Sequence, residues 1–380
     1  MFSDRRRWDA ATNPLAVLVE KERHAGAEIL DLTISNPTRA GFEYPREEIL
    51  AALSDARALI YDPQPRGILF AREAVAKWYA ARSIEVDASR ILLTASTSEA
   101  YAYLFKLLAN PGDEVLTPRP SYPLFEHLAA LESVDIKQYP LRYDGAWHVD
   151  FDALERAITA RTRAIVVVNP NNPTGSLLAF DEIERLDVLA AARNLAIISD
   201  EVFADYTFRG GHPTLIRDRH TLTFSLNGLS KSAGLPQMKL GWMVVSGPGC
   251  EGALERLEWI ADTYLSISSP VQVAAPRLLA CASAVQSQIL QRAKSNLATL
   301  QSALANSPFQ VLNTEGGWCA VIQVARTRTE EQWTLDLLRD QNVLVQPGFF
   351  YDFETEAYLV VSLLTEPSLL QEGIRRLQIL

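Results

Sequence analysis

Short apolar runs alternate with helical patterns in the middle of the chain, from about residue 90 to 250. The runs are rich in valine, isoleucine and leucine, which is typical of strands buried on both faces of a parallel sheet. They cover residues 91–94, 114–117, 163–168, 195–199, 221–226 and 242–246. Helices are predicted between them, over 97–109 and 180–193 among others. The pattern therefore predicts an α/β fold: a three-layer domain around a mostly parallel sheet.

The pattern changes after about residue 285. A long helical pattern over 282–305 is followed by short apolar runs and by another helix over 329–339. This mixed order is typical of a small α+β unit. We therefore predict a large domain formed by residues 51–285 and a small domain formed by residues 1–50 together with 286–380. The length of 380 residues agrees, because it exceeds the usual size of one compact core.

Composition narrows the class of protein. Hydrophobic residues make up 48% and charged residues 22% of the chain, which is ordinary for a globular enzyme. The net charge of -10 argues against nucleic acid or an anionic membrane as a partner. No apolar run is long enough to cross a bilayer, and the first residues lack the apolar stretch of a signal peptide. The three cysteines and five histidines are scattered, so we predict a cytoplasmic protein without a metal site.

Distinctive polar and aromatic residues stand where the apolar runs end. Open parallel sheets bind their ligands just beyond the carboxyl ends of the strands. The residues at or soon after these ends include Ser96, Thr97, Tyr122, Asn172, Asp200 and Lys231. A random scatter would not produce this coincidence, so we predict that the functional site lies along this edge of the sheet.

Lys231 follows an apolar run and a small polar loop. A lysine held there would lose hydration, which disfavours its charged form and lowers its pKa. Such an amine can form a Schiff base with a carbonyl compound. Taken alone, a lysine in a loop is more often a solvated surface residue. The other residues at the strand ends must therefore be considered before choosing between the two interpretations.

Each companion has a structural and a functional interpretation. Ser96 and Glu99 match a helix capping box, and the same helix N-terminus could seat a phosphate. Asp200 could cap the next segment, or pair with a protonated ring nitrogen such as the pyridinium of pyridoxal phosphate. Tyr122 could pack in the core or stack on such a ring. Asn172 could belong simply to a turn, or its amide could donate to a ligand oxygen.

In this order and spacing, the segments resemble the class I/II aminotransferases, a family of fold-type I pyridoxal phosphate enzymes. The resemblance covers nearly the whole chain. Its motifs are Tyr-Asp-Pro-Gln-Pro-Arg-Gly at 61–67, Asn-Pro-Thr-Gly at 172–175, Ser-Asp-Glu at 199–201, Ser-Lys at 230–231, Gly-Trp at 241–242 and Pro-Gly at 347–348. The resemblance implies pyridoxal 5'-phosphate as the cofactor. It also implies that an amino group moves between an amino acid, or another amine, and a 2-oxo acid.

The resemblance also gives roles to single residues. It implies that Lys231 forms the Schiff base with the cofactor and later moves the proton of the substrate α-carbon. Asp200 would pair with the ring nitrogen, Asn172 would donate to the ring O3′, and Tyr122 would stack on the ring. Tyr61 would reach the phosphate bound by the partner subunit, which implies a homodimer with shared active sites.

On the phosphate side, the resemblance places Ser96 and Thr97 in the phosphate seat and makes Ser230 a further cofactor contact. Four cofactor-side positions depart from the family: Ser96 replaces a glycine of the phosphate seat, Gly228 replaces a serine, and the other two are Lys239 and Phe203. Lys239 stands where the family has an arginine, and a lysine neutralises a phosphate without gripping it in two places. Phe203 replaces a tyrosine that also donates to O3′, so the remaining contacts are expected to be redistributed.

The largest departure concerns the substrate. Family members usually bind the substrate α-carboxylate with an arginine in the C-terminal strand, and the aligned residue here is Val360. Either another cation, such as Arg39 or Arg66, binds the carboxylate, or the amine substrate lacks one. The first is favoured, because Arg39 follows the loop at Ser35 that the family places beside the substrate. Trp318 could line the substrate pocket or only pack in the core of the small domain.

The motifs leave the reaction itself open. Transamination is favoured, but a lyase, decarboxylase or synthase of the same fold would use the same cofactor, which is the electron sink in all of them. Product analysis separates these reactions. A non-catalytic ligand sensor that retains the fold is a third interpretation, and the intact Lys231, Asp200 and Asn172 argue against it.

Overall fold

A computed structural model describes residues 3, 5, 13–211, 214–217 and 219–379. Its largest element is an eight-stranded sheet in the order β2-β9-β8-β7-β6-β3-β4-β5. The strands are β2 (Ile91–Thr94), β3 (Glu114–Arg119), β4 (Asp135–Tyr143), β5 (Trp147–Val149), β6 (Thr162–Val168), β7 (Ala196–Asp200), β8 (Thr223–Gly228) and β9 (Gly241–Ser246). The β4–β3–β6–β7–β8 pairs are parallel, whereas β9 and β5 run antiparallel to their neighbours. The predicted α/β fold with a mostly parallel sheet is confirmed.

Helices cover both faces of this sheet, because successive side chains of a strand point to opposite sides. Val166 and Ile198 pack toward α4 (Thr97–Leu108), α5 (Leu124–Leu131) and α9 (Cys250–Tyr264). Their neighbours Ile165 and Ile197 pack toward α6 (Phe151–Ala157) and α7 (Phe180–Ala192). The other end of this second face is covered by α2 (Arg46–Leu53), α3 (Leu69–Ala80) and α10 (Ser269–Ala280). Strands that are apolar on both faces therefore form the middle of three layers.

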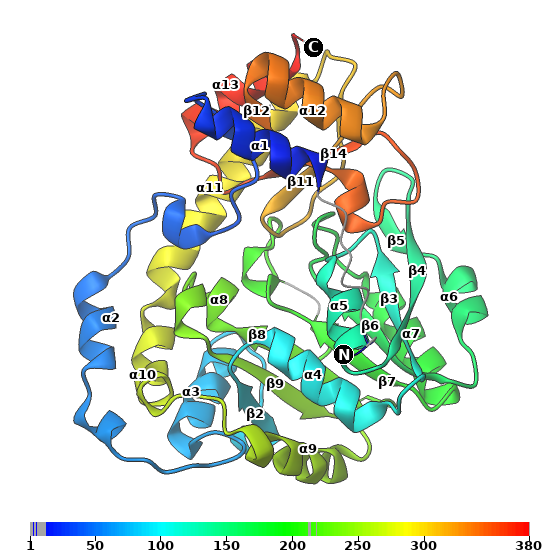
Figure 1. Ribbon diagram of the computed structural model, residues 1–380. Coiled ribbons are helices and arrows are strands. Elements are labelled where there is room, and N and C mark those ends of the chain that lie inside the picture. Colours follow the sequence, from blue (N-terminus) through cyan, green and yellow to red (C-terminus); the bar gives the residue numbers. More distant parts are fainter. Residues whose placement is uncertain (1–2, 4, 6–12, 212–213, 218, 380) are drawn as a thin grey trace.

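A second, four-stranded sheet lies at the other end of the molecule (Figure 1). Its order is β10-β11-β14-β13, and all of its pairs are antiparallel. The strands are β10 (Gln310–Val311), β11 (Cys319–Gln323), β13 (Gln346–Pro347) and β14 (Tyr358–Ser362). It packs with α11 (Ala282–Leu304), α12 (Glu330–Gln341) and α13 (Pro367–Leu377). Short 3-10 helices complete the chain: η1 (Pro37–Arg39), η2 (Ala56–Leu59), η3 (Ala88–Arg90), η4 (Ala204–Tyr206), η5 (Pro236–Met238) and η6 (Gly348–Tyr351).

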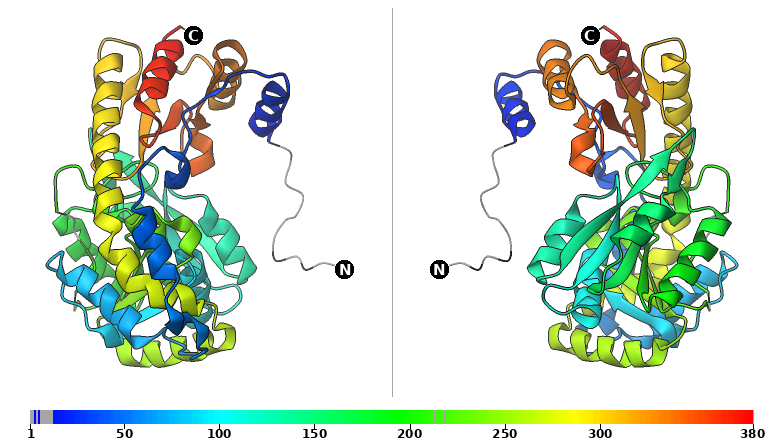
Figure 2. Two further views of the ribbon diagram at one scale, coloured as in Figure 1. Left: turned by 90° about the vertical axis from the view of Figure 1, so that its left-hand side faces the viewer. Right: turned by 90° about the vertical axis from the view of Figure 1, so that its right-hand side faces the viewer.

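The N-terminal segment is shared between the two parts. Helix α1 (Pro14–His24) packs against α12, and β1 (Leu30–Asp31) pairs in parallel with β12 (Val343–Leu344). Helix α2, in contrast, packs against α10 beside the large sheet. Helix α11 runs between the two parts (Figure 2), because Val285 packs beside Phe203 and Leu297 packs in the core of the small sheet. The domain limits at residues 50 and 285 stay a prediction.

Two findings concern the described part of the chain as a whole. No helix in it is long and apolar enough to cross a membrane. The same residues contain no cluster of three or more histidine, cysteine, aspartate or glutamate side chains arranged to hold a metal ion.

Candidate active site

A cavity with about 680 Å³ of empty space lies at the carboxyl ends of the central strands. Seven residues predicted from the sequence line it: Ser96, Thr97, Tyr122, Asn172, Asp200, Ser230 and Lys231. They follow or end five different strands, β2, β3, β6, β7 and β8. The parallel sheet therefore brings together side chains that are up to 135 positions apart (96 to 231) in the sequence.

Lys231 lies on α8 (Leu229–Ser232), a single helical turn directly after β8. Its amine nitrogen Nζ stands 4.7 Å from the ring centre of Trp318 and 5.5 Å from that of Phe203. Burial lowers the pKa of Lys231 below its usual value, and the nearby Cys319 and Asp200 partly oppose this. A larger fraction of the amine is therefore neutral, and thus nucleophilic, than for a lysine in water.

Asp200 is the last residue of β7 and only 8% exposed. Tyr101 Oη donates to its Oδ2 at 3.1 Å, and the Val202 N–H donates to Oδ1 at 3.2 Å. Burial raises the pKa of Asp200 to about 6, although these two hydrogen bonds and Lys231 lower it. A cation bound in the cavity would stabilise the ionised carboxylate, because opposite charges attract strongly where water is excluded.

The start of α4 forms another wall of the cavity. Ser96 caps the helix through its Oγ, which accepts from the Glu99 N–H at 3.2 Å, while Glu99 accepts from the Ala95 N–H at 2.7 Å. Gly241 passes close by: a Cβ there would lie 2.9 Å from the Ser96 carbonyl carbon and 3.1 Å from the Thr97 nitrogen. The N–H groups of the first helical turn and the neighbouring hydroxyls suit an anion such as a phosphate.

These walls fit pyridoxal 5'-phosphate. The α4 N-terminus suits its phosphate, the buried Asp200 carboxylate suits a protonated ring nitrogen, and the Lys231 amine suits its aldehyde. Asn172 offers an amide for a ring oxygen. Tyr122 offers an aromatic face, and its ring lies edge-on to Phe125 at 6.2 Å. Anion seat, carboxylate and amine occupy different walls of one cavity.

Several predicted residues lie outside this cavity. Tyr61 is 76% exposed and lines a separate hollow together with residues 62–65 and Ala261 of α9. Lys239 is exposed, with a left-handed backbone (φ 51°), and does not line the cavity. Ser35 and Arg39 are also exposed, beside and within η1. Trp318 is 2% exposed and packs edge-on to Phe203 at 5.4 Å, so it is both a packing residue and a neighbour of Lys231.

Two positions bear on the substrate carboxylate. Val360, at the place of the family arginine, is 1% exposed and packs with Trp147 and Tyr351. Arg66 donates from Nε to Glu258 at 2.7 Å. This ion pair engages one edge of the Arg66 guanidinium, so Arg66 is less free to bind a substrate carboxylate than an unpaired arginine would be.

Sequence reasoning missed three neighbours of the site. Tyr101 lies one helical turn after Thr97 on α4, so the helical period would have pointed to it. Cys319 is close enough to Lys231 to raise its pKa. Tyr206 donates a hydrogen bond to the Lys231 carbonyl at 2.6 Å. Neither residue belongs to a motif, and only the packing of distant segments brings them to Lys231.

The site combines a buried lysine, a carboxylate and an anion-binding helix N-terminus at the strand ends of a three-layer fold. This combination defines a pyridoxal phosphate enzyme of fold type I. Residues 27–377 match the family "Aminotransferase class I and II", and the chain belongs to this family. The protein is a pyridoxal phosphate-dependent aminotransferase, a transferase of nitrogenous groups.

Relatives agree with this assignment. The glutamate-pyruvate aminotransferase AlaA of Haemophilus influenzae is 27% identical over 95% of this chain and 92% of its own. The Escherichia coli AlaA is 32% identical over 67% of this chain and 65% of its own. An alanine aminotransferase from Pyrococcus furiosus has the same fold, with a TM-score of 0.88, 24% identity and coverage of 96% and 95% of the two chains. An aminotransferase from Escherichia coli superposes with a TM-score of 0.84 at 26% identity, covering 96% and 93%.

Proposed function

We propose that this protein transfers the amino group of an α-amino acid to a 2-oxo acid, with Lys231 as the catalytic residue. The observation that carries the proposal is the buried Lys231 amine, which shares one cavity with Asp200 and the α4 N-terminus. The names of the AlaA relatives suggest glutamate and alanine as the first amino donors to test.

Each residue then has a defined task. Bound pyridoxal phosphate supplies an electron sink for the substrate α-carbon. Lys231 Nζ holds the cofactor and carries the α-proton, for which its lowered pKa is suitable. Asp200 binds the ring nitrogen, Asn172 the ring oxygen, and Tyr122 covers the ring face. The phosphate is held by Ser96, Thr97 and Ser230, which line the cavity, whereas a contribution of Lys239, which does not line it, stays a prediction from the sequence.

A homodimer is part of the proposal. Leu59, Ile60 and Tyr61 are 89%, 67% and 76% exposed, and Trp259 on α9 is 79% exposed. Tyr61 and the end of α9 line the same hollow. Large exposed apolar side chains favour burial against a second copy, and Tyr61 would then contribute to the partner's active site.

We also propose a cytoplasmic location. All three cysteines, Cys250, Cys281 and Cys319, are free thiols, which agrees with a reducing compartment.

The test is the absorption spectrum of the purified protein with pyridoxal phosphate, recorded before and after addition of glutamate or alanine. We expect a visible cofactor band that disappears with the amino acid while the matching 2-oxo acid accumulates. Lys231→Ala should abolish the band, whereas Lys137→Ala, in strand β4, should not. Release of ammonia or carbon dioxide would indicate a lyase or decarboxylase instead, and failure of wild-type protein to form any band would refute the role of Lys231.

A further inference from the structure

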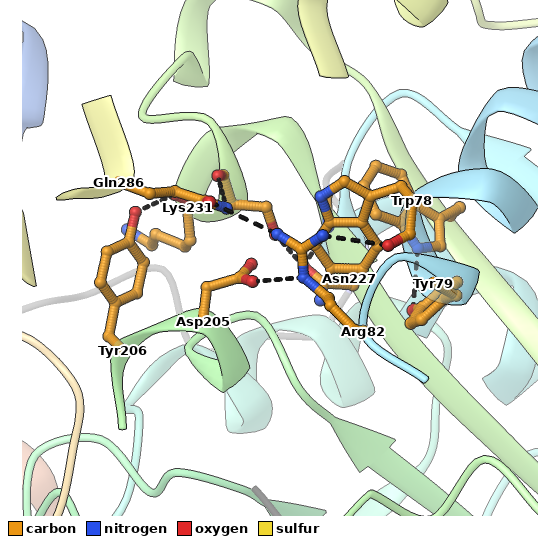
Figure 3. Close-up of polar contacts among 11 residues, drawn as sticks. Trp78, Tyr79, Arg82, Asp205, Tyr206, Asn227, Lys231 and Gln286 are labelled. Carbon is orange, nitrogen blue, oxygen red and sulfur yellow. Dashed lines mark hydrogen bonds and ion pairs between the residues drawn. The ribbon is translucent and has the colours of Figure 1, made fainter. Parts of the chain in front are cut away.

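The backbone that carries Lys231 is held by side chains from two other elements (Figure 3). Helix α8 is one turn long, and side chains from other elements add hydrogen bonds to its last carbonyl groups. The Lys231 carbonyl accepts hydrogen bonds from the Gly234 N–H at 3.0 Å and from Tyr206 Oη at 2.6 Å. The next carbonyl, that of Ser232, accepts one from Gln286 Nε2 on α11. Two consecutive peptide groups are thus tethered by η4 and α11.

Arg82 determines which end of the Gln286 amide faces Ser232. Its Nη2 donates to Gln286 Oε1 at 3.3 Å, which leaves the Nε2 donor for the Ser232 carbonyl. A guanidinium has only donors, so a reversed amide would set donor against donor. Arg82 is held in turn by Asp205, whose Oδ1 accepts from Nε at 2.8 Å, and by the ring of Trp78, 3.8 Å away.

Both tethers converge on η4. Asp205 anchors Arg82, and the next residue, Tyr206, anchors the Lys231 carbonyl. The Asp205 side chain is 8% exposed and Tyr206 is fully buried, which limits the access of water to these hydrogen bonds. The Tyr206 ring also packs edge-on to Trp318 at 5.1 Å, and Trp318 is the ring beside the Lys231 amine. Tyr206 therefore contacts both the backbone of Lys231 and the surroundings of its side chain.

We infer that Tyr206, Gln286 and Arg82 are positioning residues that hold the Lys231 backbone where its amine can bond to the cofactor aldehyde. None of the three lines the cavity, so they act through Lys231 and not on the ring or phosphate. The inference rests on the proposed role of Lys231. It predicts that disturbing the tethers weakens the bond to the aldehyde and spares the other cofactor contacts.

The test compares two ligands of the cofactor-free protein. Pyridoxal phosphate bonds to Lys231, whereas pyridoxamine 5'-phosphate has the same ring and phosphate but no aldehyde. Tyr206→Phe removes one hydroxyl, and Gln286→Glu replaces the amide donor by a carboxylate. We expect each variant to bind pyridoxal phosphate about 3- to 10-fold more weakly, the usual effect of one hydrogen bond, and pyridoxamine phosphate within about twofold of wild type.

Matched controls make the same chemical changes elsewhere. Tyr139 Oη donates to the Val166 carbonyl at 2.8 Å, and Gln288 Nε2 on α11 donates to the Glu43 carbonyl at 2.8 Å. Tyr139→Phe and Gln288→Glu should leave the ratio of the two affinities unchanged. Equal loss of both affinities in the Tyr206 and Gln286 variants, no loss, or the same selective loss in the controls would overturn the inference.

The experiment also allows for a variant that does not fold, and it distinguishes failure of the positioning role from failure of the proposed function. If Gln286→Glu does not fold, Tyr206→Phe, which preserves the side-chain volume, decides the question. Lys231→Ala serves as the reference for complete loss of the bond. If Lys231→Ala binds pyridoxal phosphate as tightly as wild type, both the positioning role and the proposed function fail; if it does not, a negative result for Tyr206 refutes the positioning role alone.

Discussion

At the residue scale, the exchange of one arginine for Val360 changes how a substrate carboxylate must be bound. Val360 faces Trp147 and Tyr351 in an apolar cluster, where an unpaired carboxylate would be costly to bury. The Arg39 side chain is exposed and, within the described part of the chain, has no hydrogen-bond or ion-pair partner. The next residue, Ala40, is buried in the same cluster as Trp318. The Arg39 guanidinium is therefore free of protein partners, and the chain next to it packs in the cluster that contains Trp318.

Arg39→Ala should raise the KM for the amino acid at least about tenfold, the usual effect of losing one charge-assisted hydrogen bond. The unfolding free energy should stay the same, because the side chain is exposed. Steady-state kinetics with glutamate or alanine measures the first and denaturant unfolding the second. Arg46→Ala, at the exposed start of α2, is the control. An unchanged KM would exclude Arg39 as the carboxylate-binding residue and would favour an amine substrate without an α-carboxylate.

At the element scale, the apolar periodicity predicted helices and strands close to those observed. The helix expected over 97–109 is α4 (Thr97–Leu108), and the one expected over 180–193 is α7 (Phe180–Ala192). Strand β4 was not predicted, because its sequence, Asp-Ile-Lys-Gln-Tyr-Pro-Leu-Arg-Tyr, has no continuous apolar run. Its strand conformation depends on pairing with β3. Local pattern identifies buried strands, whereas polar strands near a sheet edge are fixed by their neighbours.

The contact between β9 and α4 leads to a prediction about Gly241. Gly241→Ala would force the new methyl group against backbone atoms of Ser96 and Thr97, so one element must shift. We expect a loss of about 1–3 kcal/mol of unfolding free energy together with weaker binding of pyridoxal phosphate. Denaturant unfolding and cofactor titration measure the two effects.

Gly252→Ala is the control for this substitution. Gly252 lies within α9, where a Cβ meets only the end of the flexible Arg256 side chain, at 3.2 Å. Alanine should be neutral or slightly stabilising in the helix, by up to about 1 kcal/mol. Equal effects of the two variants would show that the close approach of β9 to the phosphate seat is unimportant.

At the scale of the whole molecule, the site is divided between residues of one chain and, by our proposal, Tyr61 of a second copy. Mixing Lys231→Ala with Tyr61→Ala subunits should then produce hybrid dimers with one intact site. Random reassembly should restore activity to about a quarter of wild type, because half of the dimers are hybrids and each has one working site of two. Size-exclusion chromatography with light scattering checks that the assembly is a dimer.

The control mixes Lys231→Ala with Asp200→Ala. Both residues line the same cavity of one chain, so each hybrid site carries one defect and activity should not return. Recovery in this mixture, or none in the first, would contradict shared active sites.

The order of residues along the chain already settles the class of fold and the edge of the sheet where the chemistry lies. Strand periodicity and the residues that follow each strand are local properties, and parallel strands bring their carboxyl ends to one edge. That is why seven predicted residues line one cavity. Packing alone decided that Tyr101 reaches Asp200, that Arg66 is bound to Glu258, and that Tyr206 and Gln286 hold the Lys231 backbone. Contacts between side chains far apart in sequence depend on the relative placement of whole elements, which no local pattern contains.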